Sequence, residues 1–139
     1  MISFHYETAF NLPNEEHLEE WISKVITSEN HEEGTLSYIF CSDEYLYKIN
    51  KGYLNHDTYT DIISFDYSEG ITVSGDIFIS IDRVAENAKN YNVSFQDELK
   101  RVMVHGVLHY CGYSDKTKKK AAVMRLKEDE KIKMFHVEH

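Results

Sequence analysis

Two histidines four residues apart, His105 and His109, constrain this chain more than any other feature of its sequence. On a helix they lie on one face, about one turn and roughly 6 Å apart, so both imidazoles can reach the same ion. Gly112 then ends the helix, because glycine takes a left-handed backbone conformation without a Cβ clash. The chain can fold back, and Asp115 can supply a third ligand. Two imidazoles and one carboxylate leave the fourth position of a tetrahedral zinc ion open to water, which indicates a catalytic rather than a structural site.

Gly106, the residue directly after His105, narrows the chemistry of such a site. Zinc peptidases of the HExxH type carry a glutamate at this position as the general base. Glycine has no side chain that accepts a proton, so a peptidase mechanism loses its base while the metal ligands remain. A metallopeptidase with an HxxxHxxGxxD site is therefore an alternative that Gly106 disfavours. The other alternative for this run is a buried apolar helix whose histidines are satisfied internally.

The chain of 139 residues fits one domain, expected to span residues 1–139, and can bury a core without disulfide bonds. Its two cysteines, Cys41 and Cys111, lack metal-type spacing and are expected to be reduced thiols of a cytosolic protein. No apolar run approaches the length that spans a bilayer, and the N-terminus lacks the pattern of a signal peptide. The expected location is the cytoplasm, without membrane contact.

The formal net charge of -9 is unfavourable for a nucleic-acid enzyme, because phosphate backbones are bound mainly by Lys and Arg. The charge is uneven, however, and a basic strip directly follows the third ligand position. This strip consists of Lys116, Lys118, Lys119 and Lys120. It could hold RNA beside the metal, or it could form the solvated first turns of a helix.

Hydrophobic periodicity predicts strands and helices in succession along the whole chain. Strands are expected at residues 2–6, 35–41, 60–67 and 71–80. Helices are expected from residue 13 or 14 until Gly34 breaks the helix, from residue 42 or 43, and over residues 82–91, 94–111 and 115–135. Strands placed between helices predict an α+β fold, with a mixed sheet of about four strands and helices packed over it.

The run from His105 to Asp115 resembles the H-G-x-L-H-x-x-G-Y motif of the YbeY family, bacterial metal-dependent endoribonucleases that act in ribosomal RNA maturation. Residues 49–53 and 60–65 are similar to the family's L-N-x-x-Y and T-D-V-L-S-F motifs. Residues 75–80 are similar to its G-D-I-x-I-S motif. Order and spacing match over residues 37–115, more than half of the chain.

The resemblance implies a metalloprotease-like YbeY fold with the metal-binding helix at its centre. It implies a zinc-dependent, single-strand-specific endoribonuclease that carries one zinc ion per chain on His105, His109 and Asp115. The implied role is 16S ribosomal RNA maturation and ribosome quality control, with ribosomal RNA and the ribosome or its assembly proteins as partners. Asp61 and Ser64 belong to the motif that the family places by the metal cleft, and with Lys116 they are candidate substrate-binding residues.

Two positions depart from the family pattern. Asp115 stands where a histidine is usual, and a carboxylate ligand lowers the net charge of the site from about +2 to +1, so bound water should be less acidic. Leu54 stands where the family usually has an arginine thought to contact phosphate, which leaves the catalytic residue unassigned. His56, in the loop that follows, is a candidate for part of that role. A metal-stabilised ribosome- or RNA-binding factor with little catalysis is therefore a second alternative.

Ligating histidines are usually oriented by carboxylates outside the ligand shell. Asp61 and Glu98 are the candidates for this role. Glu98 lies seven residues before His105, about two turns away on roughly the same helix face, and is expected along the wall of the cleft.

Overall fold

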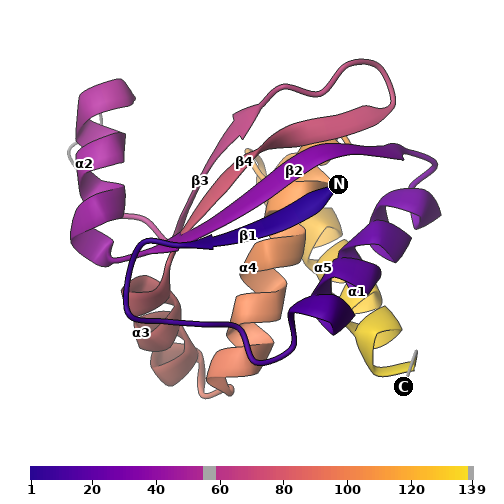
Figure 1. Cartoon of the computed structure of the whole chain (residues 1–139). Coiled ribbons are helices and arrows are strands. Elements are labelled where there is room, and N and C mark those ends of the chain that lie inside the picture. Colours follow the sequence, from indigo (N-terminus) through magenta and orange to yellow (C-terminus); the bar gives the residue numbers. More distant parts are fainter. Residues whose placement is uncertain (55–58, 138–139) are drawn as a thin grey trace.

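The computed structural model describes residues 1–54 and 59–137, and its four described strands form one mixed sheet (Figure 1). The strands are β1 (Ile2–Tyr6), β2 (Glu32–Cys41), β3 (Ile62–Asp66) and β4 (Thr72–Ser80), in the order β1-β2-β4-β3. β1, β2 and β4 are parallel to one another, and β3 runs antiparallel to β4. The α+β fold with a mixed sheet of about four strands is confirmed.

Helices cover both faces of the sheet, with most of them on one side (Figure 1). The described helices are α1 (Glu15–Ser28), α2 (Asp43–Tyr53), α3 (Ile81–Tyr91), α4 (Phe95–Tyr110) and α5 (Lys118–Val137). α4 packs on β3 and β4 and has α1, α3 and α5 beside it, while α1 also covers β1 and β2. α2 packs against β3 and β4 through a separate small cluster around Leu46 and Ile63. The helix with the two histidines is therefore central, as expected.

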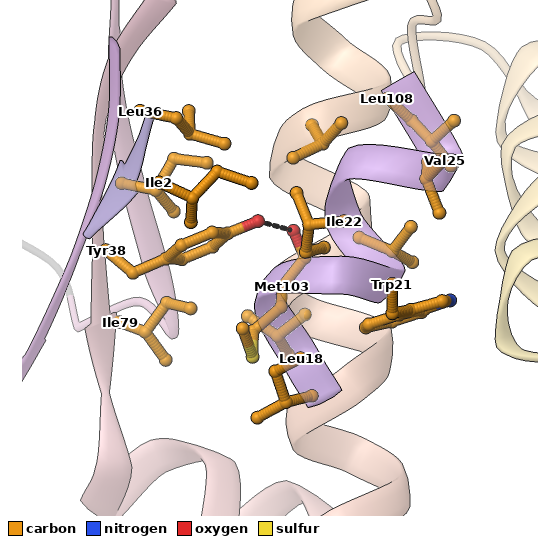
Figure 2. Packing of buried hydrophobic residues seen from close by; sticks show 14 of the residues in the cluster. Ile2, Leu18, Trp21, Ile22, Val25, Leu36, Tyr38, Ile79, Met103 and Leu108 are labelled. Carbon is orange, nitrogen blue, oxygen red and sulfur yellow. Dashed lines mark hydrogen bonds between the residues drawn. The ribbon is translucent and has the colours of Figure 1, made fainter. Parts of the chain in front are cut away.

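The main core lies between the sheet and helices α1 and α4, as Figure 2 shows. Apolar residues at helical spacing on α1, including Leu18 and Ile22, meet the inward-facing residues of β2 and β4. The buried Tyr38 hydroxyl donates a 2.9 Å hydrogen bond to the carbonyl oxygen of Met103 on α4. A buried hydroxyl needs such a partner, and this one ties the sheet to α4.

Gly106 lets α4 lie close to the sheet. A Cβ at this position would come 3.0 Å from Cδ1 of Ile77 and 3.2 Å from Cδ1 of Ile62. One turn further on, the Tyr110 hydroxyl lies 3.0 Å from the carbonyl oxygen of Phe65 on β3. This face of α4 is thereby committed to the sheet, so the face with His105 and His109 turns toward α5 and the loop before it.

The expected end of the first helix is wrong. α1 ends at Ser28 rather than near Gly34, and Asn30 takes a left-handed conformation with φ of 59°. Gly34 lies inside β2, where a Cβ would collide with the Ser74 side chain and the carbonyl oxygen of Val73. The glycine therefore permits a close approach of two strands and does not end a helix.

The last helix begins three residues later than expected, at Lys118 instead of residue 115. The side chain of Thr117 accepts a 3.1 Å hydrogen bond from the backbone N–H of Lys120, which caps the helix at this point. Asp115 is therefore left in the loop between α4 and α5. Among the helices in the described part of the chain, none has a long enough apolar stretch to cross a membrane.

Candidate metal centre

Three polar side chains meet where α4 ends. The Nε2 atoms of His105 and His109 lie 2.9 Å apart. Oδ2 of Asp115 lies 3.3 Å from Nε2 of His105 and 3.7 Å from Nε2 of His109. Each residue thus offers one ligand atom to a common point. The structure brings together the three residues that the sequence predicted as ligands.

The separations of these atoms suit a small tetrahedral ion. Zinc bonds of 2.0–2.2 Å place neighbouring ligand atoms about 3.3 Å apart around a tetrahedron. The three observed separations, 2.9, 3.3 and 3.7 Å, lie on both sides of this value. A divalent ion therefore fits the donor set without rearrangement of α4.

Gly112 ends α4 and turns the chain back toward the histidines. Its φ is +102°, a conformation that residues with a side chain rarely adopt. The N–H of Gly112 donates to the carbonyl oxygen of His109, and the N–H of Tyr113 donates to that of Leu108. This pair of bonds is the Schellman arrangement, which commonly ends a helix at a glycine. The predicted helix end is confirmed, and it brings Asp115 back to the helix.

The same turn orients His109. Nδ1 of His109 lies 3.1 Å from the backbone carbonyl oxygen of Tyr113. A carbonyl oxygen only accepts hydrogen bonds, so we assign the proton of neutral His109 to Nδ1 and the lone pair to Nε2. The Nε2 lone pair then faces His105 and Asp115.

His105 is oriented from another helix. Its Nδ1 lies 2.6 Å from Oε2 of Glu128 on α5, and the other oxygen of Glu128 accepts a 2.9 Å bond from Arg101. Asp61 or Glu98 was expected in this orienting role, and that expectation is wrong. Glu128 is 23 residues beyond His105. Sequence patterns do not reveal this role of Glu128, because its position depends on how α5 crosses α4. A buried acidic residue on a helix is nevertheless the kind of signal that points to such a partner.

These hydrogen bonds point the lone pairs of both histidines at the same place. If both Nδ1 atoms carry hydrogen, two Nε2 lone pairs face each other at 2.9 Å, an arrangement that a cation or a proton must separate. Burial disfavours the charged imidazole, yet Glu128 and Asp115 outweigh it and raise the pKa of His105. Burial and the charge on His105 lower the pKa of His109. The donor set thus has the chemistry of a cation site.

A pocket of about 430 Å³ opens beside the site, and two of the three candidate ligands, His105 and Asp115, line it. Its charged lining includes Asp61, Glu98, Arg101, Arg125 and Glu128. Burial, which disfavours a charged carboxylate, raises the pKa of both Asp61 and Glu98. The expected position of Glu98 along the cleft wall is confirmed, and Asp61 also lines the pocket.

Other candidate residues lie away from this pocket. Ser64 is exposed on β3 beside the Tyr110 hydroxyl, and Lys116 is exposed in the loop after Asp115. Neither is among the described residues that line the pocket, and the same holds for Leu54, which caps the end of α2. His56 lies outside the described residues. The roles of Ser64 and Lys116 in substrate binding stay predictions.

A buried ion pair supports the loop that carries Tyr113. The Tyr113 hydroxyl donates a 2.7 Å bond to Oε1 of Glu29, at the end of α1. Oε2 of Glu29 lies 2.7 Å from Nζ of Lys131 on α5, whose side chain is almost fully buried. Burial opposes ionisation of Glu29, but hydrogen bonds from Lys131 and Tyr113 outweigh it and lower its pKa. The sequence gives no local sign of this support, because its three members come from three distant segments.

The fold and the site define an α+β protein with a candidate two-histidine, one-carboxylate metal centre where a central helix turns into a loop. The family model described as Endoribonuclease YbeY matches residues 3–136, and the chain belongs to this family. It is 64% identical over 138 residues to the protein named Endoribonuclease YbeY in Flavobacterium johnsoniae, covering 99% of each chain. It is 60% identical to the protein of that name in Flavobacterium psychrophilum, covering 99% of this chain and 98% of the relative. The resemblance inferred from the motifs is confirmed.

The fold has a counterpart among solved structures. The solution structure of TM1509 from Thermotoga maritima aligns with a TM-score of 0.71, covering 99% of this chain and 91% of that one. Sequence identity between the two is 24%. At this identity the likeness concerns the fold alone, and it agrees with the α+β architecture.

Proposed function

We propose that this chain is a metal-dependent endoribonuclease that cleaves single-stranded RNA with one zinc ion held by His105, His109 and Asp115. The observation that carries the proposal is the convergence of three ligand atoms beside an open pocket. It is supported by relatives at 64% and 60% identity that are named endoribonucleases. When bound, the ion would polarise a phosphoryl oxygen and make water a stronger nucleophile near neutral pH.

We further propose maturation of 16S ribosomal RNA and ribosome quality control as the cellular role, in the cytoplasm. The partners would be ribosomal RNA and the ribosome or its assembly proteins. The support for this finer assignment is the family membership, together with the motifs at residues 49–53, 60–65 and 75–80 that resemble the family pattern. The proposal is tested by the 16S RNA ends of cells that lack the protein, and correctly matured ends would contradict it.

The charges around the pocket support the proposed metal dependence of RNA binding. Four carboxyl groups lie at the pocket, on Asp61, Glu98, Asp115 and Glu128. Among the described residues that line it, only Arg101 and Arg125 carry guanidinium groups. An anionic phosphodiester would be repelled by this balance, whereas a divalent cation on the three ligands brings the pocket close to neutral. The raised pKa of Asp61 and Glu98 favours their uncharged forms, which also reduces the negative charge of the pocket.

Residues of this chain would then have separate tasks. Glu128 and the carbonyl oxygen of Tyr113 hold the two imidazoles with their Nε2 lone pairs toward the ion. Asp115 contributes the third ligand and one negative charge, which makes bound water less acidic than on three histidines. Asp61 lies in the pocket within reach of a bound nucleotide and remains the candidate substrate contact with the strongest positional support.

The metallopeptidase alternative meets a steric obstacle as well as a chemical one. A side chain at position 106 would be directed at Ile77 and Ile62 of the sheet. The general base of a zinc peptidase has to reach water at the metal, and a base typically contributes 10²–10⁴-fold. Position 106 of α4 therefore has no glutamate, and a glutamate side chain there would have no room to reach the metal.

RNA cleavage by the purified protein tests the proposal. We expect slow single-turnover cleavage of an unstructured RNA that stops on chelation and returns with zinc. His109→Ala should abolish the cleavage, and casein should not be degraded. Equal rates for the natural protein and His109→Ala would assign the cleavage to contamination and favour a binding factor with little catalysis. Casein hydrolysis that depends on His109 would favour the peptidase.

A further inference from the structure

A second hollow adjoins the metal pocket. Its volume is about 250 Å³, and its lining includes residues of α3, α4 and α5. Tyr91, Glu98, Arg101 and Arg125 line both spaces, so the two hollows share a wall. The second hollow therefore lies next to the metal pocket, on the other side of these side chains, and the three metal ligands do not line it.

The two arginines in the shared wall differ in how far they are already engaged. Arg101 makes bonds of 2.9 Å to Glu128 and 2.7 Å to Asp129, and its side chain is 22% exposed. The Arg125 guanidinium lies 4.0 Å from Glu128 and its side chain is 60% exposed. Glu128 already receives bonds from His105 and Arg101. Most N–H groups of Arg125 are thus available to a ligand, and guanidinium binds phosphate through paired hydrogen bonds.

Tyr91 supplies an aromatic surface in the same shared wall as Arg125. It ends α3, and 59% of its surface is exposed although it lines both hollows. Val93 and Ile132 add apolar surface to the second hollow, and His136 adds a further ring. Exposed aromatic rings next to a cation are the usual means of holding single-stranded nucleic acid, because bases stack on the ring while the cation binds phosphate.

We infer that an RNA strand runs from the metal pocket past Arg125, which binds a backbone phosphate, into the second hollow, where Tyr91 stacks on a base. The inference rests on the proposed ribonuclease function and adds a nucleotide subsite to it. Asp97 also lines the second hollow, so attraction there depends on Arg125 and on stacking rather than on a broad positive field.

Binding of a short unstructured RNA to the zinc-loaded protein tests the inference, measured by fluorescence anisotropy at several salt concentrations. Arg125→Gln should weaken binding at least about fivefold and reduce the slope of log affinity against log salt by about 0.7, the value for one phosphate contact on a single strand. Tyr91→Ala should weaken binding roughly 5- to 150-fold, whereas Tyr91→Phe should bind like the natural protein, because stacking needs the ring and not the hydroxyl. RNA recovered after the measurement is checked on a denaturing gel.

Matched controls separate the subsite from general effects of charge and exposed rings. Lys133→Gln removes one positive charge from an exposed position of the same helix, α5, and should change neither affinity nor slope. Tyr67→Ala removes a ring with 62% exposure, close to that of Tyr91, from a position outside both hollows. Zinc content should equal that of the natural protein in all five variants, which excludes loss of the metal centre as the cause.

Two results would overturn the inference, and they are distinguishable. If the natural protein cleaves RNA but Arg125→Gln and Tyr91→Ala bind it as tightly as Lys133→Gln and Tyr67→Ala do, the strand follows another path. In that case the proposed function stands and only the subsite is wrong. If the natural protein neither binds nor cleaves RNA, the proposed function and the subsite both fail.

Discussion

His105 and His109 lie four residues apart on one helix, but different kinds of structure hold them. A carboxylate from another helix, that of Glu128 on α5, binds Nδ1 of His105. The backbone carbonyl of Tyr113, four residues further along the same chain segment, binds Nδ1 of His109. The α5 side of the site thus depends on a buried charged side chain, whereas the loop side depends on backbone conformation. The two sides should therefore respond to different mutations.

The largest effect is expected on the α5 side, from Glu128→Ala. The change removes the hydrogen-bond acceptor of His105 and leaves Arg101 without one of its two partners. Loss of such an outer partner typically lowers metal affinity 10- to 100-fold, so we expect a loss of about that size. Glu128→Gln keeps an acceptor oxygen and should lose less. Zinc competition against a chromogenic chelator measures both, and an unchanged affinity in Glu128→Ala would show that the carboxylate does not orient His105.

On the loop side, Gly112→Ala should act through the backbone. Nothing lies within 4 Å of an added Cβ, so the cost comes from the φ of +102°, which an alanine adopts only with strain. A strained residue of this kind costs about 1–3 kcal/mol. If the loop relieves half of that strain by moving Tyr113 and Asp115, zinc binding loses about 0.5–1.5 kcal/mol, and zinc affinity falls about 2- to 12-fold.

Gly52→Ala is the matched control for this change. It also adds a Cβ with nothing within 4 Å, but it lies in α2 and has no positive φ. Alanine is favoured over glycine inside a helix by roughly 0.5–1 kcal/mol, so this variant should unfold at a slightly higher temperature and bind zinc normally. Equal behaviour of the two variants in thermal unfolding and zinc titration would show that the conformation of Gly112 does not shape the site.

A smaller effect on zinc affinity is expected from Glu29→Gln. Glu29 does not contact the ligands and supports the loop only through its hydrogen bond with the Tyr113 hydroxyl. Glu29 has a lowered pKa in the folded protein, so its carboxylate stabilises the fold above the ordinary value of 4.5, and this contribution is lost as the pH falls below it. At neutral pH we expect Glu29→Gln to lower the free energy of unfolding by about 1–3 kcal/mol and zinc affinity only a few-fold. The difference in stability from the natural protein should shrink below about pH 4.5.

Urea unfolding of both proteins at several pH values measures this difference in stability, and Glu20→Gln, at an exposed position of α1, is the control. A difference that stays constant with pH would contradict the role of the Glu29 charge.

The smallest change is expected from Asp115→His. Imidazole is a good zinc ligand and restores the charge that the carboxylate takes from the site. Zinc affinity should stay within a few-fold of that of the natural protein in an equilibrium titration. A collapse of affinity would mean that the loop after Gly112 does not present position 115 to the ion as the geometry indicates.

The two sides also differ in how far they could be predicted. The spacing of His105 and His109 places them on one helix face, and Gly112 predicts the turn that returns Asp115, because helix geometry and the freedom of glycine act over a few residues. The expected start at residue 94 is also a local feature, because the Ser94 side chain accepts a hydrogen bond from the N–H of Asp97 and caps α4. Local features of this kind depend on the neighbouring backbone alone.

Glu128, Arg125 and Gly34 show where such local inference ends. The sequence favours Asp61 and Glu98 over Glu128 as the carboxylate that orients His105. It also predicts a helix end at Gly34, which instead allows β2 to approach Ser74. The position of each depends on how elements distant in the sequence pack against one another. The sequence by itself determined the three candidate ligands, the end of the helix that carries them and the α+β class. Only the tertiary structure decided which carboxylate orients His105 and which arginines line the pocket, because packing of α5 across α4 joins residues that no short-range pattern connects.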